Sequence, residues 1–284
     1  MTTPHDPEAI PGKTVALTRH ARDCECRGGD RPRAAGASHC AYERLAPYLD
    51  LPSRLARDGC ISDLEFDEVY PLAVRAVSSW FWTPVRVALR AAQLLAFGAR
   101  SRVLDVGSGA GKFCILAAAS TGATFVGVEQ RERFVRAARE AARRFGVTSA
   151  QFVHGTMDAV NVLDFDAVYL FNPFEENLWQ HELRLDDEVE LSAKRFAADV
   201  AQARRLLSHA RLGTRVVTYH GFGGRMPVGY SPVLQERTRL GDLDLWIKTQ
   251  THSEAGQSVR LCVDLPDPTE VERTHPPAFC RTRV

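Results

Sequence analysis

The stretch "VLDVGSGAGKF", residues 103–113, places an aspartate, three glycines and a lysine directly after an apolar run. Glycines spaced in this way let the backbone approach a ligand closely, because they carry no side chain and tolerate unusual backbone angles. Loops of this kind bind an ATP phosphate, a dinucleotide or another nucleotide-like ligand. The glycines alone leave these three possibilities open.

The ATP-binding P-loop is the first of these possibilities to fail. Its pattern is G-x-x-x-x-G-K-[ST]. Gly111 and Lys112 match the end of that pattern, but Val106 stands where the first glycine belongs and Phe113 where the metal-binding hydroxyl belongs. The spacing therefore excludes a P-loop, and we expect Lys112 to be a solvated residue on the first turn of a helix.

The dinucleotide fingerprint G-x-G-x-x-G fits the loop in part. Gly107 and Gly109 match it, but Lys112 occupies the position of the third glycine, which packs the helix against the strand. Glu129, at the end of the next predicted strand, suits a ribose in a dinucleotide and in other nucleotide-like ligands. A nicotinamide-dependent oxidoreductase therefore stays open as an alternative.

Acidic and polar residues follow four successive predicted strands. Asp105 precedes the glycines, Glu129 ends the run "FVGVE", Asp158 follows the third strand in "VHGTMDAV", and "FNPF" ends the fourth. Ligands of doubly wound sheets bind at the carboxyl ends of the strands. We therefore expect these residues to surround one site.

This constellation resembles the class I S-adenosylmethionine-dependent methyltransferases. Their pattern is an acid and G-x-G-x-G at the first strand, an acid after the second, a polar residue after the third and a substrate-facing motif after the fourth. The resemblance covers about residues 80 to 250 and implies a Rossmann-like fold, S-adenosylmethionine as cofactor and methyl transfer as activity. The start of the loop, D-x-G-S-G, is also similar to that of the non-SET histone lysine methyltransferases.

The resemblance implies a role for each acid. Asp105 orders the loop and faces the amino-acid end of the cofactor, and Glu129 accepts hydrogen bonds from both ribose hydroxyls. Asp158 accepts from the adenine amino group, with Met157 beside the ring. Alternatively, Asp158 caps the turn that follows it.

Residues ahead of the first strand complete the predicted cofactor site. In related enzymes a loop there closes over the methionine part of the cofactor, and Trp82 and Thr83 match it. Thr83 equally suits the N-cap of a helix. The full predicted cofactor-binding set is Trp82, Thr83, Asp105, Gly107, Ser108, Gly109, Gly111, Glu129, Gln130, Met157, Asp158 and Asn172.

The segment "YLFNPFEEN", residues 169–177, is the candidate for acceptor binding. It resembles the [DNS]-P-P-[YF] motif of methyltransferases that act on amino groups of adenine or glutamine, without its second proline. It also resembles the N-N-F segment of the non-SET lysine methyltransferases, whose long basic extensions this chain lacks. Asn172 and Phe174 are predicted to contact the acceptor, with transfer to nitrogen. Glu175 and Glu176 either attract a cationic amine or form a solvated pair.

His220 follows the fifth predicted strand and is the nearby side chain suited to proton removal near neutral pH. The predicted catalytic set is therefore Asn172, Phe174 and His220, although a lone histidine is often structural. The acceptor stays open: a protein lysine or other amine, a nucleic-acid base or a small metabolite. A non-catalytic S-adenosylmethionine-binding module is a further alternative.

The elements that must position these residues follow from the hydrophobic pattern. Between residues 101 and 220, apolar runs alternate with helical periodicity, which predicts an α/β fold with a doubly wound, mostly parallel sheet. The alternation in "DLDLWIKTQ", residues 242–250, predicts an antiparallel edge hairpin. Residues 83–98 predict a helix with Thr83 as N-cap and Gly98 at its end.

Composition sets the wider frame. With 284 residues, 45% hydrophobic content and a formal charge of +1, the chain can bury a full core and gives no sign of a dedicated nucleic-acid binder. No apolar run is long enough to span a bilayer and the start lacks the pattern of a secretory signal, so we expect a cytoplasmic protein. The oligomeric state stays open. The predicted organisation is a flexible N-terminal tail (1–40), a helical cap (41–98), a cofactor-binding methyltransferase domain (99–250) and a C-terminal extension (251–284).

The seven cysteines are scattered and odd in number, which is not a disulfide framework and fits a reducing cytosol. Cys24, Cys26, His39 and Cys40 raise the question of a zinc site. Their C-x-C spacing departs from the usual C-x-x-C knuckle, within a polar, Gly- and Arg-rich segment. We therefore favour a flexible tail with incidental thiols and predict no metal site.

Overall fold

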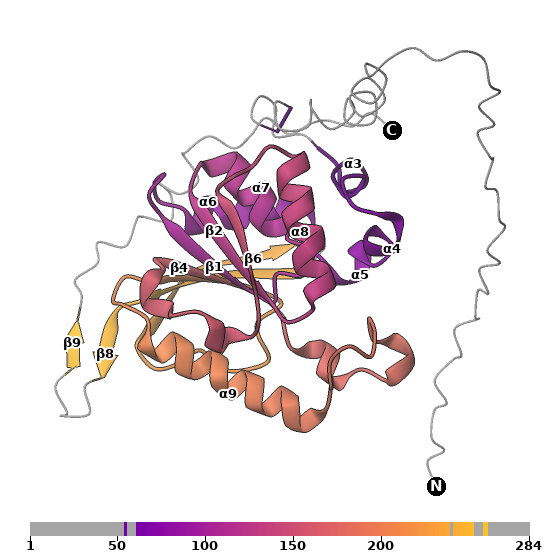
Figure 1. Cartoon of the computed structure of the whole chain (residues 1–284). Coiled ribbons are helices and arrows are strands. Elements are labelled where there is room, and N and C mark those ends of the chain that lie inside the picture. Colours follow the sequence, from indigo (N-terminus) through magenta and orange to yellow (C-terminus); the bar gives the residue numbers. More distant parts are fainter. Residues whose placement is uncertain (1–53, 56–60, 239–240, 253–257, 261–284) are drawn as a thin grey trace, which may run out of the picture. The chain divides into compact units, whose positions relative to one another are not determined.

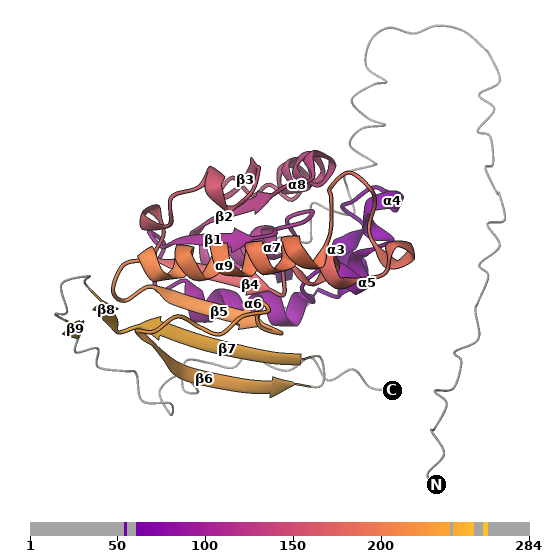
Figure 2. The ribbon, with the colours of Figure 1, turned by 90° about the horizontal axis from the view of Figure 1, so that it is seen from below.

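A single mixed sheet organises the protein. The computed structural model describes residues 54–55, 61–238, 241–252 and 258–260. Seven strands follow the order β3-β2-β1-β4-β5-β7-β6, from the top to the bottom of Figure 2. The strands are β1 (Arg102–Val106), β2 (Thr124–Glu129), β3 (Ala150–His154), β4 (Ala167–Phe171), β5 (Arg215–Tyr219), β6 (Tyr230–Thr238) and β7 (Gly241–Lys248).

The first five strands are parallel, and β7 runs antiparallel to both β5 and β6. Strands such as β1 read as apolar runs because helices cover both faces of the sheet. The predicted α/β fold with an antiparallel edge is therefore confirmed. The prediction located β7, whereas β6 was not located, because Pro232 and a bulge between Pro232 and Leu234 interrupt its alternation.

Helices cover the two faces of the sheet unequally. On one face α6 (Val85–Leu95), α7 (Lys112–Thr121) and α8 (Glu132–Arg144) pack over the larger core cluster. On the other face α9 (Ala193–His209) packs over a second cluster, and Figure 1 shows it on the opposite side of the sheet from α6 and α7. The right-handed alternation of strand and helix thus gives the two layers that the sequence predicts.

Short helices precede the sheet: α3 (Asp63–Asp67), α4 (Leu72–Arg75) and α5 (Ser78–Phe81). They belong to the described part of the predicted cap. The boundaries of the four predicted regions stay predictions. Residues 1–40, with Cys24, Cys26, His39 and Cys40, lie outside the described residues, as do most of residues 251–284, where a separate pair β8 (Gln250–His252) and β9 (Ser258–Arg260) is described.

The predicted start of α6 is wrong. The helix begins at Val85 and Pro84 occupies the N-cap position, which offers no side-chain cap. The Val85 N–H instead donates to Asp63 Oδ1 on α3, at 2.9 Å. Thr83 lies one residue too early, and its buried hydroxyl pairs with the Tyr169 hydroxyl at 3.0 Å. Because a buried tyrosine hydroxyl needs a hydrogen-bond partner, the Thr83 side chain pairs with Tyr169 instead of capping the helix. The helix also ends at Leu95, before Gly98.

None of the described helices is long and apolar enough to cross a membrane.

Candidate active site

A cavity lies at the carboxyl ends of β1, β2 and β4, where the sequence places the ligand site. Its space amounts to about 1060 Å³, counting the part that opens to solvent. Of the predicted site residues, eight line it: Trp82, Gly107, Gly109, Glu129, Gln130, Met157, Asn172 and Phe174. Six do not: Thr83, Asp105, Ser108, Gly111, Asp158 and His220.

The glycine loop is shaped by its close neighbours. Gly111 has a φ of +81°, and a Cβ there would lie 2.5 Å from the Phe152 ring, so a side chain is excluded by both backbone and space. Gly109 faces the Trp82 indole, which is 8% exposed and packs on Tyr70 with ring centroids 4.9 Å apart. Tyr70 donates in turn to the Ala110 carbonyl at 2.8 Å. Trp82 is therefore fixed against the loop, and its predicted contact with a cofactor stays a prediction.

Glu129 stands at the cavity wall and already organises it. Its two carboxylate oxygens accept from the N–H groups of Gly109 (3.0 Å) and Arg131 (2.8 Å). Burial raises the pKa of this carboxyl, although those two hydrogen bonds act in the opposite direction. A carboxylate held in this way is an oriented acceptor for hydroxyl groups of a ligand.

Asp105 lies behind the loop rather than in the cavity. It is 3% exposed and accepts from the Cys114 thiol of α7, with 3.3 Å between sulfur and oxygen. Burial, together with the nearby charge of Glu129, raises the pKa of the Asp105 carboxyl to about 7. The position supports its predicted ordering role. Its predicted contact with the cofactor stays a prediction.

Lys112 is not solvated, contrary to the prediction. Its side chain is 2% exposed, and its Nζ lies 2.6 Å from Asp63 Oδ1 and 2.8 Å from Asp67 Oδ1. Asp67 also accepts from the Ser78 hydroxyl at 2.5 Å. No local pattern indicates this cluster, because its carboxylates lie some fifty residues away in the chain. Lys112 therefore links α7, the helix that follows the glycine loop, to both α3 and α5.

Asp158 and His220 also lie apart from the cavity wall. Asp158 is exposed in the short turn Met157–Ala159, while its neighbour Met157 is buried and lines the cavity. His220 is exposed, has a φ of +56° and donates its backbone N–H to the Asp242 carbonyl at 3.0 Å. Its ring packs against Gly241 of the edge hairpin. The His220 ring also lies 5.9 Å, between centroids, from the ring of Phe171, which lines the cavity. Its predicted catalytic role stays a prediction.

The predicted acceptor segment does reach the cavity. Asn172 has a φ of +38° and donates its backbone N–H to the Gly221 carbonyl at 3.0 Å, while its side-chain amide donates to Glu175. Pro173 packs against Gly107, where an added Cβ would lie 3.0 Å from the proline Cβ. Phe174 is 7% exposed. The glycine loop and the acceptor segment are therefore in direct contact.

Much of the wall was not predicted. The unpredicted lining residues include three large aromatic side chains and three charged ones: Trp80, Phe81, Trp179, Arg131, Arg195 and Asp199. The run "SSWFW" carried a signal for the first two, since the prediction took its last tryptophan as a site residue. The others come from the segment between β4 and α9 and from helix termini, where no periodic pattern marks a ligand site.

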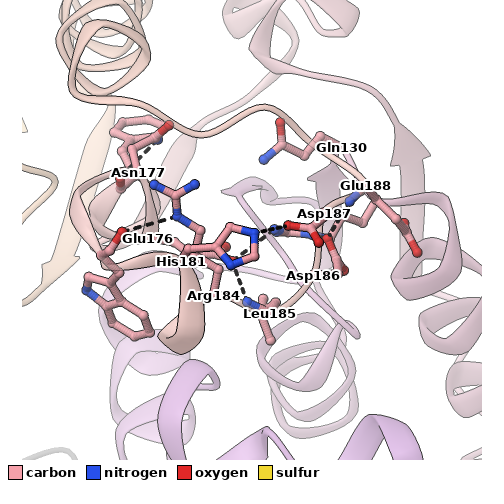
Figure 3. A network of polar contacts seen from close by, with 12 residues as sticks. Gln130, Glu176, Asn177, His181, Arg184, Leu185, Asp186, Asp187 and Glu188 are labelled. Carbon is pink, nitrogen blue, oxygen red and sulfur yellow. Dashed lines mark hydrogen bonds and ion pairs between the residues drawn. The ribbon is translucent and has the colours of Figure 1, made fainter.

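Arg131 holds that segment over the cavity. It is 4% exposed, its Nη2 lies 2.9 Å from Glu176 Oε1, and its Nε lies 2.9 Å from Asp186 Oδ1. Glu176 also accepts from the Leu185 N–H at 2.8 Å. Figure 3 shows this network, in which the turns carrying Glu176 and Asp186 face one another. Polar contacts thus hold the two ends of the segment from Glu176 to Asp186 close together.

Comparison with known proteins identifies the domain. Residues 103–187 match a family model described as a methyltransferase domain, a range that contains the glycine loop, Glu129 and the acceptor segment. The chain therefore contains a methyltransferase domain. No curated protein matches this methyltransferase in sequence.

Solved structures with a similar fold include two methyltransferases. An RNA methyltransferase from Salinibacter ruber, in complex with S-adenosyl-L-homocysteine, is 22% identical over 62% of this chain and 98% of its own, with a TM-score of 0.46. The putative methyltransferase yhhF from Escherichia coli is 13% identical over 57% of this chain and 84% of its own, with a TM-score of 0.42.

Proposed function

We propose that this methyltransferase transfers the methyl group of S-adenosylmethionine to a nitrogen atom of its acceptor. The contact between Pro173 and Gly107 carries the proposal, because it sets the acceptor segment directly against the cofactor loop. In the reaction the nitrogen lone pair attacks the methyl carbon and the bond from that carbon to sulfur breaks. S-adenosylhomocysteine leaves. An acceptor nitrogen that is protonated in solution gives up one proton to water before the attack, because an ammonium group has no lone pair.

The cofactor would occupy the side of the cavity formed by β1 and β2. Glu129 would accept from the ribose hydroxyls, and the backbone of Gly107 and Gly109 would lie against the methionine part, beneath Trp82. Met157 and Gln130 line the wall where the adenine would lie. Asp158, next to Met157, remains the predicted partner of the adenine amino group, and Asp105 would act from behind by ordering the loop.

Asn172 and Phe174 would align the acceptor. A sulfonium donor needs little activation, so the main task of the protein is to hold the nucleophile in line with the methyl group. The left-handed backbone of Asn172 presents its side chain and carbonyl at the end of β4, and a non-glycine residue in that conformation costs free energy that surrounding contacts must offset. This observation supports a binding role.

Calorimetry tests the cofactor assignment. We expect S-adenosylmethionine and S-adenosylhomocysteine to bind and NAD not to bind. Binding of NAD without binding of the sulfonium pair would favour the oxidoreductase instead. Binding of the sulfonium pair without methyl transfer to any nitrogen, oxygen or sulfur acceptor would favour a non-catalytic module. Transfer to oxygen or sulfur alone would contradict the nitrogen assignment.

We also propose that the protein acts in the cytoplasm. The scattered cysteines support this, and Cys114 is buried with a free thiol. Fractionation of cells that produce the protein would contradict it if the protein were recovered outside the cytoplasm.

A further inference from the structure

We propose that the acceptor is an alkylammonium compound, bound between the Phe81–Trp179 aromatic pair and the Glu175 carboxylate. The inference rests on the proposed methyl transfer to nitrogen and names the chemical class of the acceptor. Three observations carry it: the charge balance of the cavity wall, the pairing of its arginines and the placement of its aromatic side chains.

The described cavity wall carries more acid than base. Its carboxylates are Glu129, Glu175, Glu176 and Asp199, and its cations are Arg131 and Arg195. Fixed charges that do not cancel favour a ligand of the opposite sign. Since S-adenosylmethionine brings one positive charge at sulfur and no net charge on its amino-acid part, the wall can still accommodate a cationic acceptor.

Both arginines of the wall are already paired. Arg131 contacts Glu176 and Asp186, as described above. Arg195 Nε lies 3.0 Å from both carboxylate oxygens of Asp199, and its Nη2 donates to Gln130 Oε1 at 3.0 Å. The described wall therefore presents no arginine without a carboxylate partner for a phosphate, as a nucleic-acid acceptor would require.

Glu175 differs from the other acceptor-side acids. Glu176 and Asp199 have arginine partners, whereas the side-chain contact that the structure gives Glu175 is the amide of Asn172. Glu175 is exposed and lines the cavity. Glu175 can therefore pair with an incoming ammonium group without first giving up an arginine partner.

Aromatic rings complete the subsite. The Phe81 and Trp179 rings lie with centroids 5.0 Å apart, tilted by 46°, and both line the cavity. Trp80 also lines it while its side chain is 74% exposed, which places a large aromatic ring at the mouth. Faces of such rings attract ammonium groups and their methylated forms. Aromatic rings and a carboxylate in the wall of one cavity are thus matched to an amine that is cationic in solution and cationic again after methylation.

The position of Trp179 depends on the polar network in Figure 3. The backbone N–H of Trp179 donates to the Glu176 carbonyl at 3.1 Å, and the Trp179 carbonyl accepts from Arg184 Nε at 3.1 Å. Because Arg131 holds Glu176, the aromatic subsite is tied to the N-cap of α8, two residues beyond Glu129. Arg131 therefore contacts both the segment that carries the acceptor subsite, through Glu176, and the cofactor wall, through Glu129.

Binding to the protein loaded with S-adenosylhomocysteine tests the charge preference. The cationic probe is Nα-acetyl-lysinamide, and the matched neutral probe carries a second acetyl group on its side-chain nitrogen. We expect the cation to bind at least about tenfold more tightly, since a desolvated cation–π contact and an ion pair both vanish in the neutral probe. Equal binding of the two probes, or binding of an adenine-containing RNA oligonucleotide instead, would overturn the proposal.

Variants locate the subsite. Glu175→Gln and Trp179→Leu should each raise the KM for the cationic probe about five- to tenfold, with unchanged affinity for S-adenosylhomocysteine. The matched control is Glu182→Gln, an exposed acid of the same segment that does not line the cavity. If Glu182→Gln has as large an effect as Glu175→Gln, or if both spare the KM, Glu175 does not bind the acceptor.

A last comparison separates free amines from protein side chains. Turnover of Nα-acetyl-lysinamide and of a lysine-containing peptide is measured as release of S-adenosylhomocysteine, and the better substrate identifies the source of the alkylammonium. Loss of S-adenosylmethionine binding would contradict the proposed function itself. Binding of S-adenosylmethionine with methylation of the RNA alone would contradict only this inference.

Discussion

Two buried cations, Lys112 and Arg131, support the two sides of the cavity in different ways. Lys112 lies on the cofactor side, 2% exposed, and pairs with carboxylates of the helix α3. Arg131 lies toward the acceptor side, 4% exposed, and pairs with carboxylates of the short turns between β4 and α9. Each cation forms two ion pairs. The partners of Lys112 are residues of a helix that packs on the larger core cluster, whereas the partners of Arg131 are not.

The difference separates a preformed part of the site from an adaptable one. The loop and helix on either side of Lys112 pack into the larger core cluster. The acceptor wall consists of short 3₁₀ turns joined by polar contacts, and such segments open at lower free energy than packed helices. We therefore expect changes on the Lys112 side to alter global stability and changes on the Arg131 side to alter local opening.

Lys112→Met should have the largest effect on stability. It leaves Asp67, whose side chain is 10% exposed, without its cation, and breaking a buried pair in this way costs about 3–5 kcal/mol. Thermal and denaturant unfolding measure the loss. Arg143→Met is the matched control, because Arg143 is 69% exposed and pairs with Glu140 on the surface, where such pairs contribute about 0–1 kcal/mol. Similar losses in the free energy of unfolding of the two variants would show that the buried Lys112 pair contributes no more than the surface pair.

Asp105 should make the unliganded protein less stable as pH rises. Its folded pKa of about 7 lies above the ordinary value of 3.8, so between these values the folded state binds more protons than the unfolded state. Stability then falls from about pH 4 to pH 7, by up to about 4 kcal/mol for a shift of this size. Asp105→Asn should flatten that slope in denaturant titrations at several pH values, while the exposed Asp164→Asn should leave it unchanged. A parallel slope in Asp105→Asn would contradict the assignment.

Glu129→Ala should weaken S-adenosylmethionine binding by about 1.5–3 kcal/mol for each charge-assisted hydrogen bond lost. Calorimetry measures the change. Glu132→Ala is the control, since Glu132 begins the adjacent helix α8 with its side chain 61% exposed. Unchanged affinity in Glu129→Ala would exclude Glu129 from the cofactor site.

Arg131→Met should lower global stability less than Lys112→Met does, because the partners of Arg131 lie in segments that open locally. Hydrogen exchange within residues 175–191 should nevertheless accelerate in this variant, whereas exchange in α7 should not. Arg136→Met on the outer surface of α8 serves as control, with a side chain that is 69% exposed. Uniform acceleration across both regions would show that the two sides of the cavity open together.

The regular parts of this protein were predictable because their patterns are local. The buried runs of β1 and β2 and the amphipathic stripe of α8 can be read from consecutive residues, and the glycine loop can be read from its spacing. Glu129 was predictable because a carboxylate that ends a buried strand needs a reason to be there. Each of these features depends on residues that are close to one another in the sequence.

Other features depend on partners that are distant in the sequence. Thr83 was predicted to cap a helix, but the hydroxyl of Tyr169, brought near by β4, is its partner. The ring of His220 contacts Gly241 of the hairpin formed by β6 and β7, a neighbour that the sequence around His220 does not indicate. In both cases the deciding contact joins elements whose pairing no local pattern reveals.

The sequence by itself determined the sheet and the glycine loop, because strand and helix periods and glycine spacing are properties of neighbouring residues. The kind of cofactor followed from the resemblance to class I methyltransferases. Only the tertiary structure decided that Lys112 is buried between Asp63 and Asp67, and that Arg131 holds Trp179 and Glu176 over the cavity. The physical reason is that a charge can be buried only where folding brings its counter-charges within hydrogen-bonding distance. For this methyltransferase, those counter-charges come from the helices before the sheet and from the turns after β4.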